Sequence, residues 1–195
     1  MNGSAPVLLA STSAYRRELL GRLGLPFEAV SPDVEETLRA GESPVDRALR
    51  LALEKAHSVA ARHPGMLVIG SDQVAACGET LLEKPGSAAR CREQLALLSG
   101  HSARFHTACA VLAPSSGLNL AHVDSTTVSF RRLSEAEIAR YVERERPFDC
   151  AGGFKAESLG ISLFEAIETQ DPTALIGLPL VWLAGALRSA GYLVP

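Results

Sequence analysis

An aspartate follows an apolar run near the middle of the chain. Residues Met66–Ile69 are predicted to form a buried strand that ends at Gly70-Ser71, and Asp72 comes next. Open α/β sheets bind ligands at the carboxyl ends of their strands, so a carboxylate in this place is a candidate for metal or water chemistry. A capping or turn aspartate is the alternative, and this stretch alone favours it.

Hydroxyl and guanidinium groups follow the first apolar run. Val7–Ala10 is predicted to be a strand and Ala14–Gly24 a helix, with Ser11 in the turn between them and Arg16 and Arg17 in the first helical turns. The free N–H groups and positive dipole end of a helix N-terminus bind phosphate, and hydroxyl and guanidinium groups add donors. The alternative, favoured by these residues alone, is that a serine caps the helix and the arginines are solvated.

An acidic cluster and a lysine accompany the next two predicted elements. Asp33–Glu36 follows a predicted strand, Phe27–Ser31, and its carboxylates suit a hard cation, although a solvated loop is the commoner role. A helix is predicted to begin at Ser43-Pro44, because serine is a good N-cap and proline fits the first turn. Lys55 lies beside the apolar face of that helix, where it either reaches a cleft or extends to water. That face is predicted to contain Leu49, Leu53 and Ala56.

The remaining sequence predicts helices and strands that complete an α/β domain. Helices are predicted at Ser87–Leu98, from the Ser134–Glu137 capping box through Val142, and from Gly177–Pro179 to near Gly191. Strands are predicted at Arg104–Leu112 and Leu120–Phe130, joined as an antiparallel hairpin by Pro114–Gly117, and at Ile161–Ile167. Lys84 precedes a proline, which disfavours helix, so we expect it in an extended loop. With no repeat or linker, residues 1–195 are predicted to form a single domain.

The composition argues against several classes of protein. Hydrophobic residues make up 47% of the 195 residues and charged residues 21%, which allows a sizeable core and argues against disorder. The formal charge of −3 argues against a dedicated partner of nucleic-acid polymers or anionic membranes, because such proteins need a basic surface. A small anionic substrate needs only a few local cations and stays compatible with this charge.

The cysteines, the histidines and the N-terminal segment predict a cytoplasmic protein. The four cysteines show no C-x-x-C spacing, so we expect reduced thiols, and the five histidines form no i, i+4 pair that would support zinc. Met1–Pro6 lacks the basic and apolar segments of a signal peptide. The apolar stretches are also well short of the roughly 20 residues that span a bilayer.

Several stretches, taken together, resemble the Maf family of nucleoside triphosphate pyrophosphatases. They extend over nearly the whole chain in the family's order and spacing, and the set is specific although each stretch is weak alone. One departure is Ala14, where the family commonly has proline. The matching stretches are Leu9-Ala-Ser-Thr-Ser-Ala-Tyr-Arg-Arg-Glu-Leu-Leu20, Glu54-Lys55-Ala56, Gly70-Ser-Asp72, Lys84-Pro85, Leu98-Ser-Gly100, Ala151-Gly152 and Gly177-Leu-Pro179.

The resemblance implies both a fold and a reaction. The fold would be a two-lobed domain similar to inosine triphosphatase, with a mixed sheet, flanking helices and a central cleft. The reaction would be hydrolysis between the α- and β-phosphates of a nucleoside triphosphate, giving the monophosphate and pyrophosphate, and it would clear modified nucleotides from the cell.

The resemblance also assigns roles to individual residues. The catalytic positions match Lys55, Lys84 and Asp72, and the phosphate-binding positions match Ser11, Arg16 and, less firmly, Arg17. Glu36 and Asp72 would supply oxygen ligands for Mg²⁺ or Mn²⁺. Asp72 also matches the family's proton acceptor. A carboxylate bound to a metal is a poor base, so its role as base or as ligand stays open.

Three variable positions resemble the branch of the family that hydrolyses 7-methyl-GTP. That branch has an aromatic residue, a glutamine and a glutamate where this chain has Tyr15, Gln73 and Glu157, whereas the branch acting on dTTP and UTP typically has arginine, threonine and glutamine. The string Cys150–Glu157 also resembles the first branch, although tyrosine replaces its usual tryptophan at position 15. An aromatic ring can stack on the cationic methylated base, and a carboxylate can accept from guanine N1–H and the 2-amino group. The alternative is that Tyr15 packs in the core and Glu157 lies on a surface loop.

Other functions stay open at this point. One is hydrolysis of dTTP, UTP or another non-standard nucleoside triphosphate. Another is a nucleotide-binding regulator of septum formation, which the family's association with that process suggests. The resemblance is compatible with a homodimer, although no stretch of the sequence marks an interface.

Overall fold

The computed structural model describes residues 6–195, so most of the segment used above to argue against a signal peptide lies outside the described residues. The strands are β1 (Val7–Ala10), β2 (Phe27–Val30), β3 (Leu67–Cys77), β4 (Thr80–Leu82), β5 (Ser102–Ala113), β6 (Leu118–Phe130) and β7 (Phe164–Glu168). The α-helices are α1 (Ala14–Gly21), α2 (Pro44–Ala60), α3 (Ala88–Leu98), α4 (Glu135–Glu145) and α5 (Leu180–Ser189). Short 3₁₀ helices are η1 (Pro114–Ser116), η2 (Ala151–Gly153), η3 (Leu159–Leu163) and η4 (Ala174–Ile176).

The strands form a seven-stranded mixed sheet in the order β2-β1-β3-β5-β6-β7, with β4 paired to β3 off this path. β1 is parallel to both β2 and β3, and its last residue, Ala10, pairs with Gly70 of β3. β4 and β7 are antiparallel to β3 and β6. The neighbouring strands β5 and β6 are joined through η1 as a hairpin. The α/β fold class predicted from the sequence is therefore confirmed.

The chain divides into two compact units. Unit 1 comprises the described residues up to Gln73, together with Thr107–Asp124 and Asp171–Pro195. Unit 2 comprises Val74–His106 and Ser125–Gln170, so β3, β5 and β6 each contribute residues to both units. The cleft and the single domain implied by the resemblance stay predictions.

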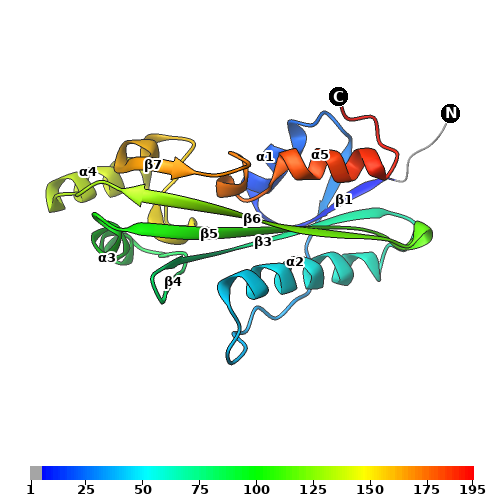
Figure 1. Cartoon of the computed structure of the whole chain (residues 1–195), viewed down its shortest axis with the longest axis horizontal. Coiled ribbons are helices and arrows are strands. Elements are labelled where there is room, and N and C mark those ends of the chain that lie inside the picture. The colour runs from blue at the N-terminus through cyan, green and yellow to red at the C-terminus, as the bar shows by residue number, and fades with distance from the viewer. Residues whose placement is uncertain (1–5) are drawn as a thin grey trace. The chain divides into compact units, whose positions relative to one another are not determined.

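Helices cover both faces of the sheet in unit 1, with α1 and α5 on one side and α2 on the other (Figure 1). The alternation of strand residues explains this arrangement. Val7 and Leu9 pack in a cluster with residues of α1 and α5, whereas Leu8 and Ala10 pack with residues of α2. Successive side chains of a strand point to opposite faces, so a strand that is apolar at every position must be covered on both.

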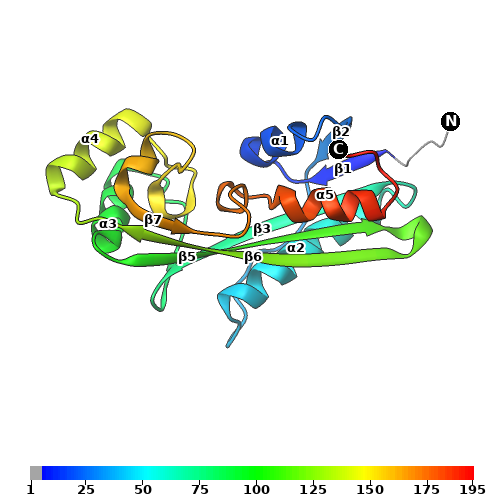
Figure 2. The same ribbon diagram turned by 45° about the horizontal axis from the view of Figure 1, so that its top comes forward.

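Unit 2 is built around an aromatic cluster. Its four phenylalanine rings pack edge to face with centroids 5.0–5.5 Å apart, a geometry that suits the quadrupoles of aromatic rings. In the same unit, helix α3 packs against α4 and η2 (Figure 2). The rings belong to Phe105, Phe130, Phe154 and Phe164.

Three predicted element boundaries were wrong. The strand expected to stop at Gly70-Ser71 continues to Cys77, because β3 goes on pairing after β1 has ended, with Ala75 opposite Leu82 of β4. Helix α1 ends at Gly21 rather than Gly24. The strand expected at Ile161–Ile167 begins only at Phe164, because Leu159–Leu163 forms a 3₁₀ helix in which the Ile161 N–H donates to the Ser158 carbonyl at 3.2 Å.

At Gly70 the backbone of β3 lies close to α2. A Cβ added there would lie 2.3 Å from the carbonyl oxygen of Ala52 and 2.7 Å from the backbone nitrogen of Ala56. These are backbone atoms, which cannot rotate away as the end of a flexible side chain would. The contact therefore requires glycine in this strand, and it brings α2 within reach of the residues that follow Gly70.

We expect Gly70→Ala to lower the free energy of unfolding by about 1–3 kcal/mol, because the added methyl overpacks the β3–α2 contact. Chemical denaturation measures this loss. Gly21→Ala is the matched control, since a Cβ there meets nothing within 4 Å and alanine favours the end of helix α1. Equal stability of the Gly70→Ala and wild-type proteins would contradict the close approach.

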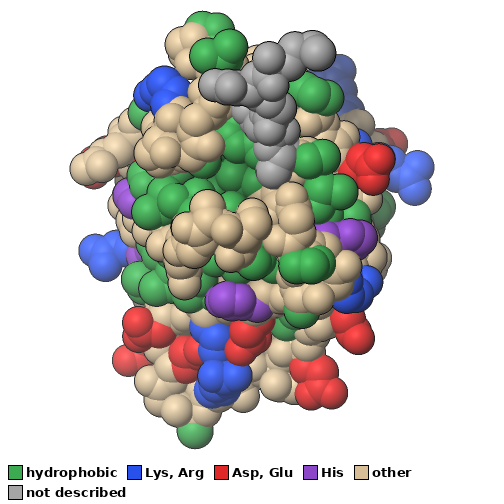
Figure 3. All heavy atoms as spheres, turned by 90° about the vertical axis from the view of Figure 1, so that its right-hand side faces the viewer, with side chains coloured by type: hydrophobic (Ala, Val, Ile, Leu, Met, Phe, Trp, Pro, Cys, Tyr) green, Lys and Arg blue, Asp and Glu red, His purple; other side chains and the backbone are tan. Residues whose placement is uncertain are grey.

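Part of the surface is apolar. Hydrophobic side chains are visible at the end of unit 1 that carries the β5–β6 turn (Figure 3). In the described chain the most exposed large apolar residues include Val181, at 65% of its accessible area, and Leu193, at 93%. None of the helices described here combines the length and the apolar character that a membrane span requires.

Candidate active site

The turn before α1 is organised by two serine hydroxyls. The Ser13 hydroxyl accepts from the backbone N–H of Arg16 at 3.4 Å and caps the helix, as the structural alternative for this turn predicted. The buried Ser11 hydroxyl accepts from the backbone N–H of Ser13 at 3.1 Å. A hydroxyl that accepts keeps its own hydrogen, so Ser11 can still donate to a phosphate oxygen.

The two arginines of α1 have different surroundings. Arg16 Nε donates to the Gly177 carbonyl at 2.9 Å, which fixes the direction of its guanidinium. Burial lowers the pKa of Arg16, and the carboxylates of Asp72 and Glu36 oppose that shift. An arginine stays charged at neutral pH, so Arg16 is a cation whose charge interacts with those of two carboxylates. Arg17 is exposed and forms no ion pair with another residue of the described chain.

Lys55 joins the two predicted metal ligands. Its Nζ lies 2.5 Å from Glu36 Oε1 and 2.5 Å from Asp72 Oδ1. The side chains of Lys55 and Asp72 are only 9% and 10% exposed, whereas that of Glu36 is 54% exposed. A buried charge must be paired, so this bridge satisfies Lys55 and Asp72 together.

The position of Lys55 on its helix differs from the prediction. The apolar face of α2 was expected to run through Leu49, Leu53 and Ala56, with Lys55 beside it, but Leu49 and Leu53 are only partly buried. Lys55 instead lies within the most buried face, and the close contact at Gly70 brings it to Asp72. The ammonium does not extend to water. The buried face consists of Ala48, Leu51, Ala52, Lys55, Ala56, Val59 and Ala60.

The carboxylates of Glu36 and Asp72 fit a hard divalent cation. The Lys55 ammonium that contacts both of them already places a positive charge there. The described residues contain no group of three or more histidine, cysteine, aspartate or glutamate side chains arranged for a metal. Two carboxylates, with further oxygens from substrate phosphates and water, are the usual environment of Mg²⁺ in phosphate-processing sites.

Gln73 holds a loop of unit 1. Its Nε2 donates to Thr107 Oγ1 at 2.8 Å and to the carbonyls of Ala174 and Leu175 at 3.1 and 3.0 Å. The Thr107 hydroxyl in turn donates to the Ala174 carbonyl at 2.8 Å. The two amide hydrogens of Gln73 are therefore shared among Thr107 and the two carbonyls of η4, which leaves its Oε1 as the atom able to accept from a ligand.

The remaining predicted site residues lie on α1 and in unit 2. Tyr15 is partly exposed on α1. In unit 2, Lys84 is exposed in the segment after β4, as predicted, and Glu157 is exposed in a turn between η2 and η3. The predicted site residues that the structure brings together are those of unit 1 described above: Lys55 in direct contact with Glu36 and Asp72, and Arg16 in electrostatic interaction with both carboxylates.

The family model described as "Maf-like protein" matches residues 6–190 of this sequence. The chain belongs to the Maf family. It is 53% identical over 189 residues to a 7-methyl-GTP pyrophosphatase of Xanthomonas axonopodis pv. citri (strain 306), covering 97% of this chain and 98% of that relative. It is 52% identical over 189 residues to a 7-methyl-GTP pyrophosphatase of Aromatoleum aromaticum, covering 97% of each.

The Maf chain also has partial structural similarity to a HAM1 protein from Coxiella burnetii. That similarity has a TM-score of 0.45 at 19% sequence identity, and it covers 66% of this chain and 74% of the other.

Two supporting groups of this Maf protein were not assigned from its sequence. Ser71 is fully buried, and its hydroxyl donates to the same Gly177 carbonyl that accepts from Arg16, at 2.9 Å. The buried Asp171 accepts from the backbone and hydroxyl of Thr173 and from the backbone N–H of Val181, which fixes the segment before α5. The sequence Asp-Pro-Thr at 171–173 carried a recognisable turn signal that could have identified this support.

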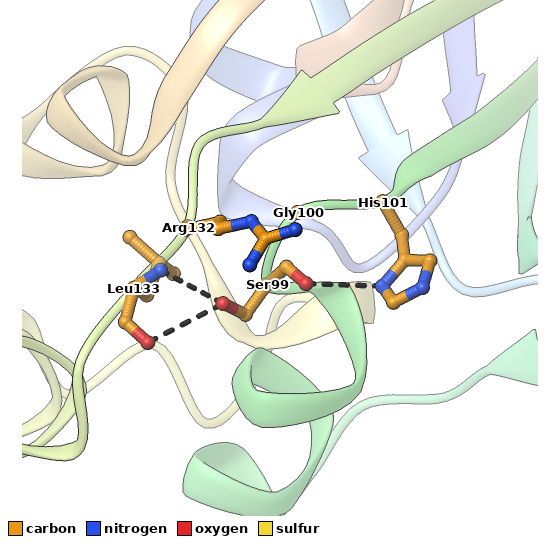
Figure 4. A pocket seen from close by; sticks show the side chains of 5 residues that line it. All are labelled: Ser99, Gly100, His101, Arg132 and Leu133. Carbon is orange, nitrogen blue, oxygen red and sulfur yellow. Dashed lines mark hydrogen bonds between the residues drawn. The ribbon is translucent and has the colours of Figure 1, made fainter.

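One Maf motif lines a separate hollow in unit 2. A cavity of about 470 Å³ is lined by Ser99, Gly100, His101, Arg132 and Leu133 (Figure 4). The Ser99 hydroxyl accepts from the Leu133 N–H at 2.7 Å and donates to the Leu133 carbonyl at 3.3 Å. None of the predicted site residues lines this cavity, so we assign the Leu98-Ser-Gly100 motif to the packing of unit 2.

Proposed function

We propose that this protein hydrolyses 7-methyl-GTP to 7-methyl-GMP and pyrophosphate. The observation that carries the proposal is the group of charges in unit 1, where Lys55 bridges Glu36 and Asp72 and the charge of Arg16 interacts with both carboxylates. Cations beside two hard oxygen donors are what a triphosphate and a divalent metal require. The names of the two relatives at 52–53% identity support the choice of substrate.

In the proposed reaction, water attacks the α-phosphorus, the bond to the oxygen bridging to the β-phosphorus breaks, and pyrophosphate leaves. Arg16, Lys55 and Lys84 donate to the phosphate oxygens and offset their charge, and Ser11 and Arg17 add donors. Glu36 and Asp72 hold Mg²⁺ or Mn²⁺, and a cation bound there supplies charge neutralisation and activation of water. The proton of the attacking water passes to Asp72, or to solvent if Asp72 acts as a ligand alone.

Recognition of the base is assigned to Tyr15 and Glu157. The Tyr15 ring stacks on the cationic methylated guanine, and the Glu157 carboxylate accepts from N1–H and the 2-amino group. Glu157 is exposed and forms no ion pair with another described residue, which supports its availability to a ligand. Gln73 contributes through its Oε1 and through the loop that it holds.

We expect Glu157→Gln to lower kcat/KM for 7-methyl-GTP by about 10- to 100-fold, because a charged acceptor is lost from one or two hydrogen bonds. Activity toward dTTP and UTP should change little. The measurement is pyrophosphate release with each nucleotide. Glu165→Gln is the control, since Glu165 is an exposed glutamate of unit 2 on β7. An equal loss with every nucleotide would contradict base recognition by Glu157.

The function itself is tested by pyrophosphate release from 7-methyl-GTP, GTP, dTTP, UTP and ITP with Mg²⁺ or Mn²⁺. Preference for 7-methyl-GTP supports the whole proposal. Preference for dTTP, UTP or another non-standard nucleotide keeps the reaction and rejects the base-binding role of Tyr15 and Glu157. Binding of nucleotide without release would favour a regulator of septum formation. Cytoplasmic location and a homodimer stay predictions.

A further inference from the structure

The segment that supplies Glu36 has neither helix nor strand. Residues 31–43, here called the acidic loop, connect β2 to the start of α2 (Figure 1) and are largely exposed. Within the described residues, a single backbone hydrogen bond joins two residues of this loop. It runs from the Glu42 N–H to the Arg39 carbonyl, at 3.2 Å. An irregular loop with so little internal bonding must be held from outside if Glu36 is to keep its place.

Side chains of α2 hold the backbone of the acidic loop. Arg47 Nη2 donates to the carbonyl of Glu36 at 3.1 Å, and Arg50 Nη2 donates to the carbonyl of Thr37 at 3.2 Å. Further along α2, the Ser58 hydroxyl accepts from a backbone N–H of the loop at 2.9 Å. The helix that carries Lys55 therefore fixes the backbone on both sides of the Glu36 Cα.

Arg50 is the centre of an ion-pair cluster between helix and loop. Its Nε and Nη2 form a fork with the two carboxylate oxygens of Glu42, at 2.5 and 2.7 Å. Its Nη1 lies 3.0 Å from Glu54, whose other oxygen accepts from Arg39 Nη2 at 2.8 Å. The Arg50 and Glu42 side chains are only 12% and 9% exposed. A forked guanidinium–carboxylate pair fixes direction as well as charge.

The charge states of this cluster are reinforced by its own contacts. The hydrogen bond to Glu42 raises the pKa of Arg50, and the hydrogen bond to Arg50 lowers the pKa of Glu42. Both groups therefore stay ionised near neutral pH. The cluster joins Arg50 and Glu54 of α2 to Arg39 and Glu42 of the loop. Both of these loop residues follow the anchored Glu36–Thr37 backbone.

We infer that Arg50 and Glu54 are positioning residues that hold Glu36 beside Lys55 and thereby set the affinity of the site for a divalent cation. This inference rests on the proposed function, because it takes Glu36 as a metal ligand. Partners that orient a metal ligand typically change metal affinity by about 10- to 100-fold when they are removed. The inference gives each residue of Glu54-Lys55-Ala56 a role: Glu54 faces the loop, Lys55 joins the carboxylates, and Ala56 packs against Gly70.

The experiment measures Mn²⁺ binding to the full chain by calorimetry without nucleotide, and then the Mn²⁺ dependence of pyrophosphate release. We expect Arg50→Met to raise the Kd for Mn²⁺ about tenfold or more. The Mn²⁺ concentration for half-maximal release should rise by a similar factor, while kcat at saturating Mn²⁺ falls much less. Arg50→Lys keeps the charge but loses the fork, so it should lie between wild type and Arg50→Met.

Two further variants keep the test decisive. Glu54→Gln preserves the Arg50–Glu42 fork and should weaken Mn²⁺ binding by a smaller factor, which matters if Arg50→Met does not fold. Arg92→Met is the matched control, because Arg92 is an exposed arginine of α3 that forms no ion pair with the described residues. Its Mn²⁺ affinity should equal that of the wild type.

The outcomes separate this inference from the proposed function. Unchanged Mn²⁺ affinity in Arg50→Lys and Glu54→Gln, or a loss of thermal stability alone, would overturn the positioning role. Wild-type protein that binds Mn²⁺ but releases no pyrophosphate would reject the proposed function while the binding series still tests Arg50 and Glu54. Wild-type protein that binds no Mn²⁺ would overturn both the metal site and this inference.

Discussion

Asp72→Asn should lose most pyrophosphate release, with kcat falling by about 10²- to 10⁴-fold, the usual loss when a positioned acid–base group is removed. The substitution keeps the size of the side chain but removes its charge. It therefore removes either the proton acceptor or a metal ligand, and it leaves Lys55 paired with Glu36 alone. Steady-state kinetics with saturating Mn²⁺ and 7-methyl-GTP measure the effect.

Circular dichroism and thermal unfolding show whether the Asp72→Asn protein keeps its fold. Asp33→Asn is the matched control, because Asp33 is an exposed aspartate of the acidic loop whose backbone N–H, rather than its carboxylate, bonds to Ser58. Its kcat should stay close to that of the wild type. Near-wild-type turnover of folded Asp72→Asn would reject the role of Asp72.

Lys55→Met should destabilise the metal-free protein by about 3 kcal/mol, because it removes the ammonium that directly contacts the buried Asp72 carboxylate. For a chain of this length, that loss corresponds to a fall in Tm of roughly 6–12 °C. Addition of Mn²⁺ should then raise the Tm of the variant more than that of the wild type, since the variant has no ammonium between its two carboxylates. Pyrophosphate release should fall by about 10²- to 10³-fold with loss of a phosphate-binding cation.

The readout for Lys55→Met is Tm by scanning fluorimetry, with and without Mn²⁺. Lys84→Met is the control for stability, because Lys84 is exposed and forms no ion pair with the described residues. Its Tm should change little in either condition. An Mn²⁺-induced shift that is the same in wild type and Lys55→Met would show that Lys55 and the metal do not share the carboxylates.

Short-range features of the fold were predictable from the sequence. Ser13, Ser43, Ser87 and Ser134 all cap helices, and at Ser134 the full capping box forms. A cap depends on a side chain and a backbone N–H three residues later, so the local sequence contains all of the necessary information. The family resemblance, rather than the local patterns alone, identified the candidate site residues. Three of those in unit 1 lie together, with Lys55 in contact with both Glu36 and Asp72.

Features that depend on distant residues were not predictable. The Gly70-Ser71 pair suggested the end of a strand. In the structure, Gly70 lacks the Cβ that would clash with the backbone of α2, and the Ser71 hydroxyl donates to the Gly177 carbonyl, 106 positions away. Lys55 could be placed on a helix but not within its buried face, because its partners come from the acidic loop and from β3. Local periodicity contains no information about either partner.

The bonds of Gln73 affect how a change of substrate could be engineered. The branch of the family that acts on dTTP and UTP typically has threonine at this position, and a threonine side chain is too short to replace the amide that donates to both Ala174 and Leu175. Exchanging residue 73 alone would therefore remove two hydrogen bonds to η4 and leave the bond from Thr107 to Ala174. The η4 segment leads directly to the Gly177 carbonyl that directs Arg16. A designer who wishes to alter the choice of base without weakening phosphate binding should transplant residue 73 together with residues 174–177.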